Sequence, residues 1–134
     1  RMISAVQFTL PGVPCVYYGD EAGIDGGVDP FNRGCYPWGN EDEELIAHYK
    51  FLGRLRKEHP VFKEGEFVPV SAALGCVAFE RRGEGERIMT VANRNEHPIV
   101  YVLPEEGWSS LTEERIGGRG LYLGAESTAI LIFR

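Results

Sequence analysis

The period of the hydrophobic pattern changes at Pro60, and this change divides the chain into two parts. Before Pro60, the clearest pattern places apolar side chains every three to four residues, which is the spacing of one face of a helix. After Pro60 they alternate, which is the spacing of one face of a strand. We therefore predict an α+β chain in which residues 1–59 form one part and residues 60–134 form an all-β domain.

The first part contains one segment that does not fit a helix. Residues 2–10 predict the end of an amphipathic helix, and residues 40–59 predict a second helix with Asn40 as its N-cap and Pro60 as its stop. Between them, residues 13–18 are apolar and rich in β-formers, which is the pattern of a strand buried on both faces of a parallel sheet. Two helices cannot bury such a strand, so we expect a larger α/β architecture that continues before Arg1.

The second part has the pattern of an antiparallel sandwich or barrel. The Gly- and Glu-rich residues 82–86 separate two runs of β-formers, which is a hairpin signal. The six predicted strands are residues 67–70, 76–81, 87–93, 99–103, 121–123 and 128–133.

Charge and composition exclude several classes of protein. The net charge of −6 argues against a nucleic-acid surface, and its acidic excess lies in the first 48 residues. No apolar run approaches the ~18 residues of a membrane-spanning helix. The three cysteines lack C-x-x-C spacing, the histidines are scattered, and the Gly-rich acidic loop does not follow the EF-hand order. We therefore expect no metal and no cofactor, and a compartment that is undetermined but leans towards the cytoplasm.

The segment from Pro11 to Glu21, with the sequence PGVPCVYYGDE, resembles the eighth barrel strand of the α-amylase superfamily, glycoside hydrolase family 13. Its continuation, through DPFNR at 29–33 and CYPW at 35–38, is most similar to the neopullulanase and cyclomaltodextrinase branch. The resemblance implies that residues 1–59 are the last unit of a (β/α)₈ barrel, a remnant of the TIM fold, and that residues 60–134 are its C-terminal β-sandwich. It also implies a retaining glycosidase whose catalytic carboxylates lie before Arg1, so we expect no catalytic residue in this chain.

The loop at 19–40 holds the candidate substrate contacts, since active sites of such barrels form from loops at the carboxyl ends of the strands. In the similar enzymes, the segment with Asp29 and Arg33 lines a glucose subsite, where an ion pair would fix both groups for sugar hydroxyls. The alternative is a surface salt bridge of small value. Phe31 and Tyr36 would stack on glucose rings, or pack the loop onto the barrel, and for Trp38 we favour packing.

Three further residues are interpreted as structural. Asp20 and Glu21 are adjacent carboxylates that could form an acid/base pair, but neighbours in an extended segment point in opposite directions. We expect Glu21 to hold the loop through buried hydrogen bonds. Trp108 is expected in the core or at an edge of the β-domain, with a surface sugar platform as the alternative.

These observations predict the C-terminal portion of a retaining α-glucan hydrolase for α-1,4 or α-1,6 bonds. Its partners would be α-glucans or maltooligosaccharides, and the chain alone would be inactive. The alternative is a non-catalytic carbohydrate-binding or structural β-sandwich module. An open strand edge at 13–18 also predicts a homo-oligomer, a dimer that pairs by strand edge or by helix through residues 1–18.

Overall fold

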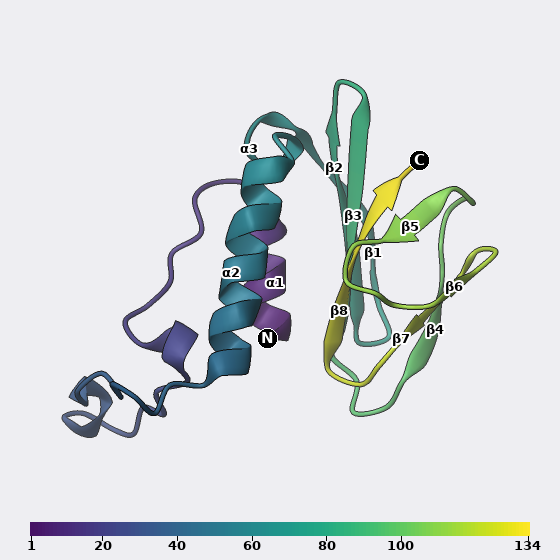
Figure 1. Cartoon of the computed structure of the whole chain (residues 1–134). Helices are drawn as coiled ribbons and strands as arrows, with labels where there is room; N and C mark the ends of the chain where they lie inside the picture. The colour runs from purple at the N-terminus through teal and green to yellow at the C-terminus, as the bar shows by residue number, and fades with distance from the viewer.

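The computed structural model describes all 134 residues, which form a helical lobe and a β-lobe (Figure 1). The helical elements are α1 (Met2–Thr9), the one-turn helices η1 (Asp20–Ala22) and η2 (Phe31–Arg33), α2 (Glu43–Glu58) and α3 (Val61–Glu64). The strands are β1 (Glu66–Ala73), β2 (Cys76–Gly83), β3 (Glu86–Asn93), β4 (Ile99–Val102), β5 (Trp108–Ser110), β6 (Ile116–Gly117), β7 (Gly120–Leu123) and β8 (Ser127–Phe133).

The strands form two antiparallel sheets, with orders β1-β2-β3-β8-β5 and β4-β7-β6. All six predicted strands are confirmed, and so is the hairpin, in which Gly83 pairs with Glu86. The short strands β5 and β6 are additional. The sequence did not indicate them because each holds a single apolar side chain, Trp108 or Ile116, and therefore shows no apolar pattern.

The five-stranded sheet is covered on both faces. Its inner face packs on the small sheet, with Met89, Val91 and Leu131 in that core. Its outer face packs on the helices, and there Ile88 and Ile130 join a second cluster that is completed by residues of α1, α2 and α3. Figure 1 shows the resulting layers, with α2 outside α1 and α1 against the large sheet. One apolar cluster therefore joins residues on both sides of Pro60, while the exact domain boundary stays a prediction.

The prediction that Asn40 caps the second helix is wrong. The helix begins at Glu43, and the Asp42 side chain accepts a 2.9 Å hydrogen bond from the Leu45 amide. The Asn40 amide instead donates to the Pro37 carbonyl in the preceding turn. An Asp carboxylate next to the first turn satisfies a free amide and also complements the helix dipole. The predicted end is confirmed, because the helix stops at Glu58, just before Pro60.

The predicted buried strand at 13–18 is also wrong. These residues form no strand, and Val13 and Tyr17 are 93% and 71% exposed. A parallel strand needs hydrogen bonds from neighbours on its sides, and no other strand of this structure lies beside the segment. The apolar run is therefore irregular and solvent-exposed, and a barrel unit is not formed. No helix combines the length and the apolar character needed to cross a bilayer.

Candidate functional site

The loop between α1 and α2 brings Asp29 and Arg33 together. Asp29 lies just before the single turn of η2 and Arg33 is its last residue, and Arg33 Nε lies 3.0 Å from Asp29 Oδ1. Backbone bonds from the Phe31 amide to Val28 O and from the Arg33 amide to Pro30 O hold the turn. The predicted ion pair is confirmed. Both side chains are more than half exposed, so the pair adds little stability and leaves its remaining donors and acceptors free for a ligand.

Three aromatic rings gather in the same loop. The Tyr36 and Trp38 ring centroids are 4.5 Å apart, and those of Tyr18 and Tyr36 are 6.3 Å apart. Trp38, for which we expected a packing role, rests on Tyr36 but is 80% exposed. Phe31 is also largely exposed and belongs to none of these ring pairs. The loop thus presents the aromatic side chains of Tyr18, Phe31 and Trp38 to solvent.

Tyr18 is the member of this cluster that the sequence did not indicate. The sequence pattern places Tyr18 in the predicted strand at 13–18; that strand does not form, and the Tyr18 ring lies against Tyr36 instead. Partial desolvation, and then the carboxylates of Glu21 and Glu41, raise the pKa of Tyr36 above its usual value. The Tyr36 hydroxyl therefore stays protonated at neutral pH and can donate a hydrogen bond.

The expected role of Glu21 is not realised. Its side chain is half-buried, but no hydrogen bond to its carboxylate forms, because the strand that was to place it in a packed sheet is absent. Backbone bonds hold this turn instead, from the Ile24 amide to Gly19 O and from the Asp42 amide to Ala22 O, each 3.1 Å. Gly19 has a φ of +83°, and a Cβ there would collide with the Ile24 side chain, so this turn requires glycine.

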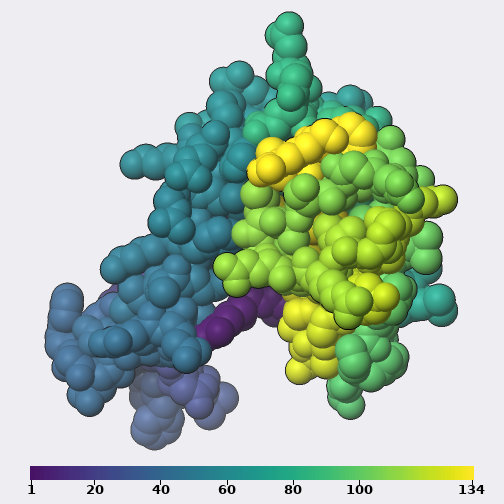
Figure 2. All heavy atoms as spheres, turned by 45° about the vertical axis from the view of Figure 1, so that its right-hand side comes forward, coloured from purple at the N-terminus to yellow at the C-terminus, as the bar shows by residue number.

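A hollow lies between the two lobes and is separate from this loop. Figure 2 shows it below the place where the lobes meet, with the purple N-terminal residues at its base. It has a volume of about 510 Å³ and is lined by α1, α2 and the segments 111–114 and 126–130. Over the whole chain, no three His, Cys, Asp or Glu side chains are grouped to hold a metal ion, and the three cysteines are unpaired.

The chain is similar to cyclomaltodextrinases and amylases. It is 35% identical over 137 residues to a cyclomaltodextrinase of Thermoanaerobacter pseudethanolicus, a match that covers 98% of this chain and 24% of that enzyme. It is 34% identical over 109 residues to a maltogenic α-amylase of Bacillus acidopullulyticus, covering 77% of this chain and 19% of the enzyme. The solved structure of an Anoxybacillus α-amylase superposes with a TM-score of 0.85 at 28% identity, covering 98% of this chain and 31% of that one. No family model matches.

The chain belongs to the α-amylase superfamily. It spans about a quarter or less of the length of the two curated relatives named above.

In this α-amylase-family chain, Trp108 lies in the core of the sandwich. It is 6% exposed, and its ring meets Phe133 edge-on at 5.2 Å. The expectation of a core position is confirmed. The alternative of a surface sugar platform at Trp108 is wrong, because the ring that would have to stack on a sugar is covered by β-lobe side chains.

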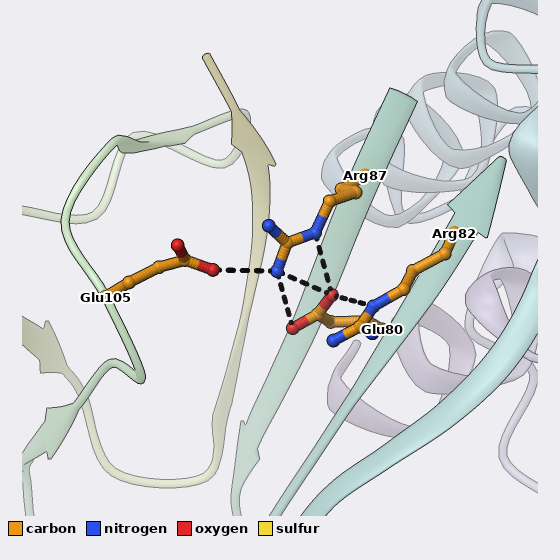
Figure 3. Close-up of polar contacts among 4 residues, drawn as sticks. All are labelled: Glu80, Arg82, Arg87 and Glu105. Atoms are coloured by element: carbon orange, nitrogen blue, oxygen red, sulfur yellow. Dashed lines mark hydrogen bonds and ion pairs between the residues drawn. The ribbon is translucent and has the colours of Figure 1, made fainter. Parts of the chain in front are cut away.

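A buried carboxylate organises the same lobe (Figure 3). Glu80 is 1% exposed and accepts hydrogen bonds from Arg82 Nε at 2.7 Å and from Arg87 Nε and Nη2 at 3.1–3.3 Å. Arg87 also reaches Glu105, and its guanidinium lies over the Phe133 ring at 4.6 Å. The Glu80 carboxylate is held on both oxygens, so this cluster is a structural part of the amylase-family β-lobe and offers no free acid for chemistry.

Proposed function

We propose that this chain is the C-terminal portion of a retaining α-glucan hydrolase that cleaves α-1,4 or α-1,6 glucosidic bonds. Its loop at 19–40 would contact the glucan through Asp29, Phe31, Arg33 and Tyr36. The observation that carries the proposal is the relationship to a cyclomaltodextrinase across 98% of the chain. The names of the relatives, which include maltogenic α-amylase and amylopullulanase, support a glucan as the ligand.

The chemistry of the loop suits a sugar ring. A pyranose has hydroxyls around its rim and C–H groups on its faces. Arg33 would donate to hydroxyl oxygens and Asp29 would accept from hydroxyl protons, while their mutual ion pair keeps both groups oriented. The exposed ring of Phe31 and the half-buried ring of Tyr36 would lie against the apolar faces of the sugar.

Hydrolysis with retention requires two carboxyl groups about 5–5.5 Å apart across the scissile bond. We propose that both belong to the part of the enzyme outside this chain, because the chain spans only a quarter of the cyclomaltodextrinase it matches. The purified chain should therefore release no reducing sugar from pullulan, maltodextrin or cyclomaltodextrin. Turnover that copurifies with the chain and disappears in an Asp20→Asn or Glu21→Gln variant would overturn this part of the proposal.

Sugar contact by the loop is tested by titrating the ¹⁵N-labelled chain with maltohexaose and following amide shifts. We expect saturable shifts in residues 28–38, with a dissociation constant near the millimolar range that corresponds to about 4 kcal/mol. Arg33→Ala should weaken binding at least tenfold. Arg54→Ala is the matched control, since Arg54 is an exposed arginine of α2 without an ion pair. Equal binding by Arg33→Ala and Arg54→Ala would contradict the assignment.

A structural role for the β-lobe is a second candidate, favoured by the apolar cluster that joins it to both long helices. This candidate predicts no saturable sugar shifts anywhere in the chain. A carbohydrate-binding role of the sandwich predicts shifts within residues 66–133 instead of the loop. The same titration thus separates the three possibilities.

We also propose that the chain self-associates. Pairing through an open strand at 13–18 is excluded because that strand does not form, which leaves α1 as the surface for the contact. Ile3 is 79% exposed there, beside an apolar groove of about 480 Å³ that Met2 and Val6 line together with the turn between β1 and β2. Light scattering should give the mass of a dimer for the chain and of a monomer for Ile3→Glu. A monomeric wild-type chain at high concentration would contradict this.

A further inference from the structure

A buried arginine from the β-lobe grips the end of α1. Arg81, on β2, is 2% exposed, and its Nη1 donates to Thr9 O at 3.2 Å and to Phe62 O at 3.0 Å. Its Nη2 donates to Gly65 O at 2.8 Å. Its partners are carbonyl oxygens, and it forms no ion pair with a carboxylate, which is an unusual environment for a buried charge. One side chain of the sandwich therefore ties together the last residue of α1 and both ends of the connection through α3.

A second arginine reaches the same end of α1 from the other side. Arg56, near the end of α2, donates from Nη1 to Phe8 O at 2.7 Å and to Leu10 O at 3.3 Å. Its Nη2 donates to Gly12 O. Arg56 thus also bonds carbonyl oxygens beyond the end of α1, in the segment that leads to the loop.

The two guanidiniums supply what a helix end lacks. The last carbonyls of a helix have no amide partner within the helix, and they carry the negative end of its dipole. Burial lowers the pKa of both arginines, and the nearby Arg56 charge lowers that of Arg81 further. A guanidinium nevertheless keeps its proton. The carbonyl oxygens therefore compensate the charge of each arginine, and the arginine N–H groups satisfy the carbonyl oxygens.

We propose that Arg81 and Arg56 are positioning residues for the loop at 19–40. They fix where the chain leaves α1, and Arg81 does so from the β-lobe, so the sandwich sets the starting point of the loop. The role of that loop in glucan contact rests on the proposed function above. The positioning itself concerns the chain without sugar and is tested separately.

The first experiment measures backbone ¹⁵N order parameters of residues 10–24 in the full chain without sugar. Arg81→Met keeps much of the side-chain length and removes the donors, and Arg56→Gln is the second variant. We expect order parameters in this segment to fall from rigid to flexible values, below about 0.6, in each variant. Leu123→Ala is the control, since it opens a cavity in the core between the two sheets and lowers global stability without touching α1.

Loss of order at 10–24 in the arginine variants but not in Leu123→Ala would support the proposal that the two arginines position the loop. The same order parameters in wild type, Arg56→Gln and Leu123→Ala would overturn it. If Arg81→Met does not fold, Arg81→Lys replaces it, because a single ammonium cannot fork to three carbonyls as the guanidinium does.

The second experiment repeats the maltohexaose titration with the folded variants, below their unfolding transitions. We expect at least tenfold weaker binding in Arg56→Gln and in the Arg81 variant, with Leu123→Ala unchanged. Undiminished affinity in both arginine variants would contradict the coupling between the sandwich and the loop. If the wild-type chain does not bind maltohexaose, the proposed function fails, while the order parameters still decide whether the arginines position the loop.

Discussion

The burial of Glu80 is not indicated by the sequence, where this residue is one charged position of a predicted strand. In the structure it is fully buried, and two arginines saturate its oxygens. Such a pair adds little net stability compared with apolar packing, but removing one partner leaves the other charge uncompensated. Glu80 is therefore expected to affect stability mainly when it is replaced, because the arginine charges are then uncompensated.

We predict that Glu80→Gln lowers the free energy of unfolding by about 3–5 kcal/mol, because Arg87 then loses its main counter-charge in a covered site. Arg82→Ala should cost about 0–1 kcal/mol, since the Arg82 side chain is 44% exposed. Urea unfolding followed by Trp108 fluorescence, with Trp38→Phe in the background of each protein, measures both. Equal losses in the two variants would show that burial of Glu80 has no special cost.

His48 is expected to make the stability of the chain depend on pH. Ser4 Oγ donates its proton to Arg1 O, so at the 2.9 Å contact with His48 the imidazole Nε2–H is the donor. Desolvation first, and then the N-terminal charge, lower the pKa of His48 below its ordinary 6.5. The folded state thus favours the neutral ring.

The sign of the effect follows from linkage. A histidine with a lowered folded-state pKa binds fewer protons when folded, so its contribution is present above pH 6.5 and is lost as pH falls through the folded value. We predict that stability declines below pH 6.5 more steeply in the wild type than in His48→Gln. Parallel curves for the two proteins, from urea titrations between pH 5 and pH 7.5 (a range of about one unit or more around that value), would contradict this.

At the scale of elements, α2 shows how a helix start is chosen. Asn40 and Asp42 are both good capping residues, and the sequence offers a glutamate three residues after Asn40. The choice falls on Asp42 because the Asp42 amide is held by Ala22 O at 3.1 Å, which fixes the chain direction at that residue. A contact with η1 therefore decides where the helix begins.

We predict that Asp42→Ala lowers the free energy of unfolding by about 0.5–2 kcal/mol, since the Leu45 amide loses its acceptor. Asn40→Ala is the matched control and should change it by less than about 0.5 kcal/mol, as surface substitutions do. Thermal unfolding by circular dichroism measures both. A larger loss in Asn40→Ala would restore the helix start that the sequence alone suggested.

At the scale of the whole molecule, the two lobes share a core. Phe62 is fully buried in the cluster that also holds Leu52 and Leu55 of α2 and Ile88 of β3. Arg81 adds polar bonds across the same junction. The lobes are therefore expected to unfold together, although the hydrophobic pattern divides the chain at Pro60.

We predict one unfolding transition, with the same midpoint for the helix signal in the far ultraviolet and for the fluorescence of Trp108. Phe62→Ala should lower stability by about 3–5 kcal/mol and shift both midpoints together. Trp38→Phe is made in the background of both proteins so that Trp108 is the sole emitter. Two separate midpoints in the wild type would mean that the lobes are independent.

The sequence by itself determined the elements whose signal is local. Short runs of β-forming residues located six strands, and the turn at 82–86 determined one hairpin. The ion pair of Asp29 and Arg33, expected from the resemblance of this segment, likewise joins residues only four positions apart. In each case the residues that indicate the feature lie within a few positions of one another, so the feature can be predicted from the sequence.

Tertiary structure decided the features that depend on residues distant in sequence. Residues 13–18 have strand-forming side chains but remain irregular, because a parallel strand exists only with neighbours to pair with. Glu80 and Arg81 are adjacent and both charged, yet they are buried on different partners because alternate strand positions face opposite sides of the sheet. Tyr18, which belongs to this irregular segment, pairs its ring with that of Tyr36. Local order is set by short-range sequence, while pairing, burial and the composition of the loop site depend on which distant segments meet.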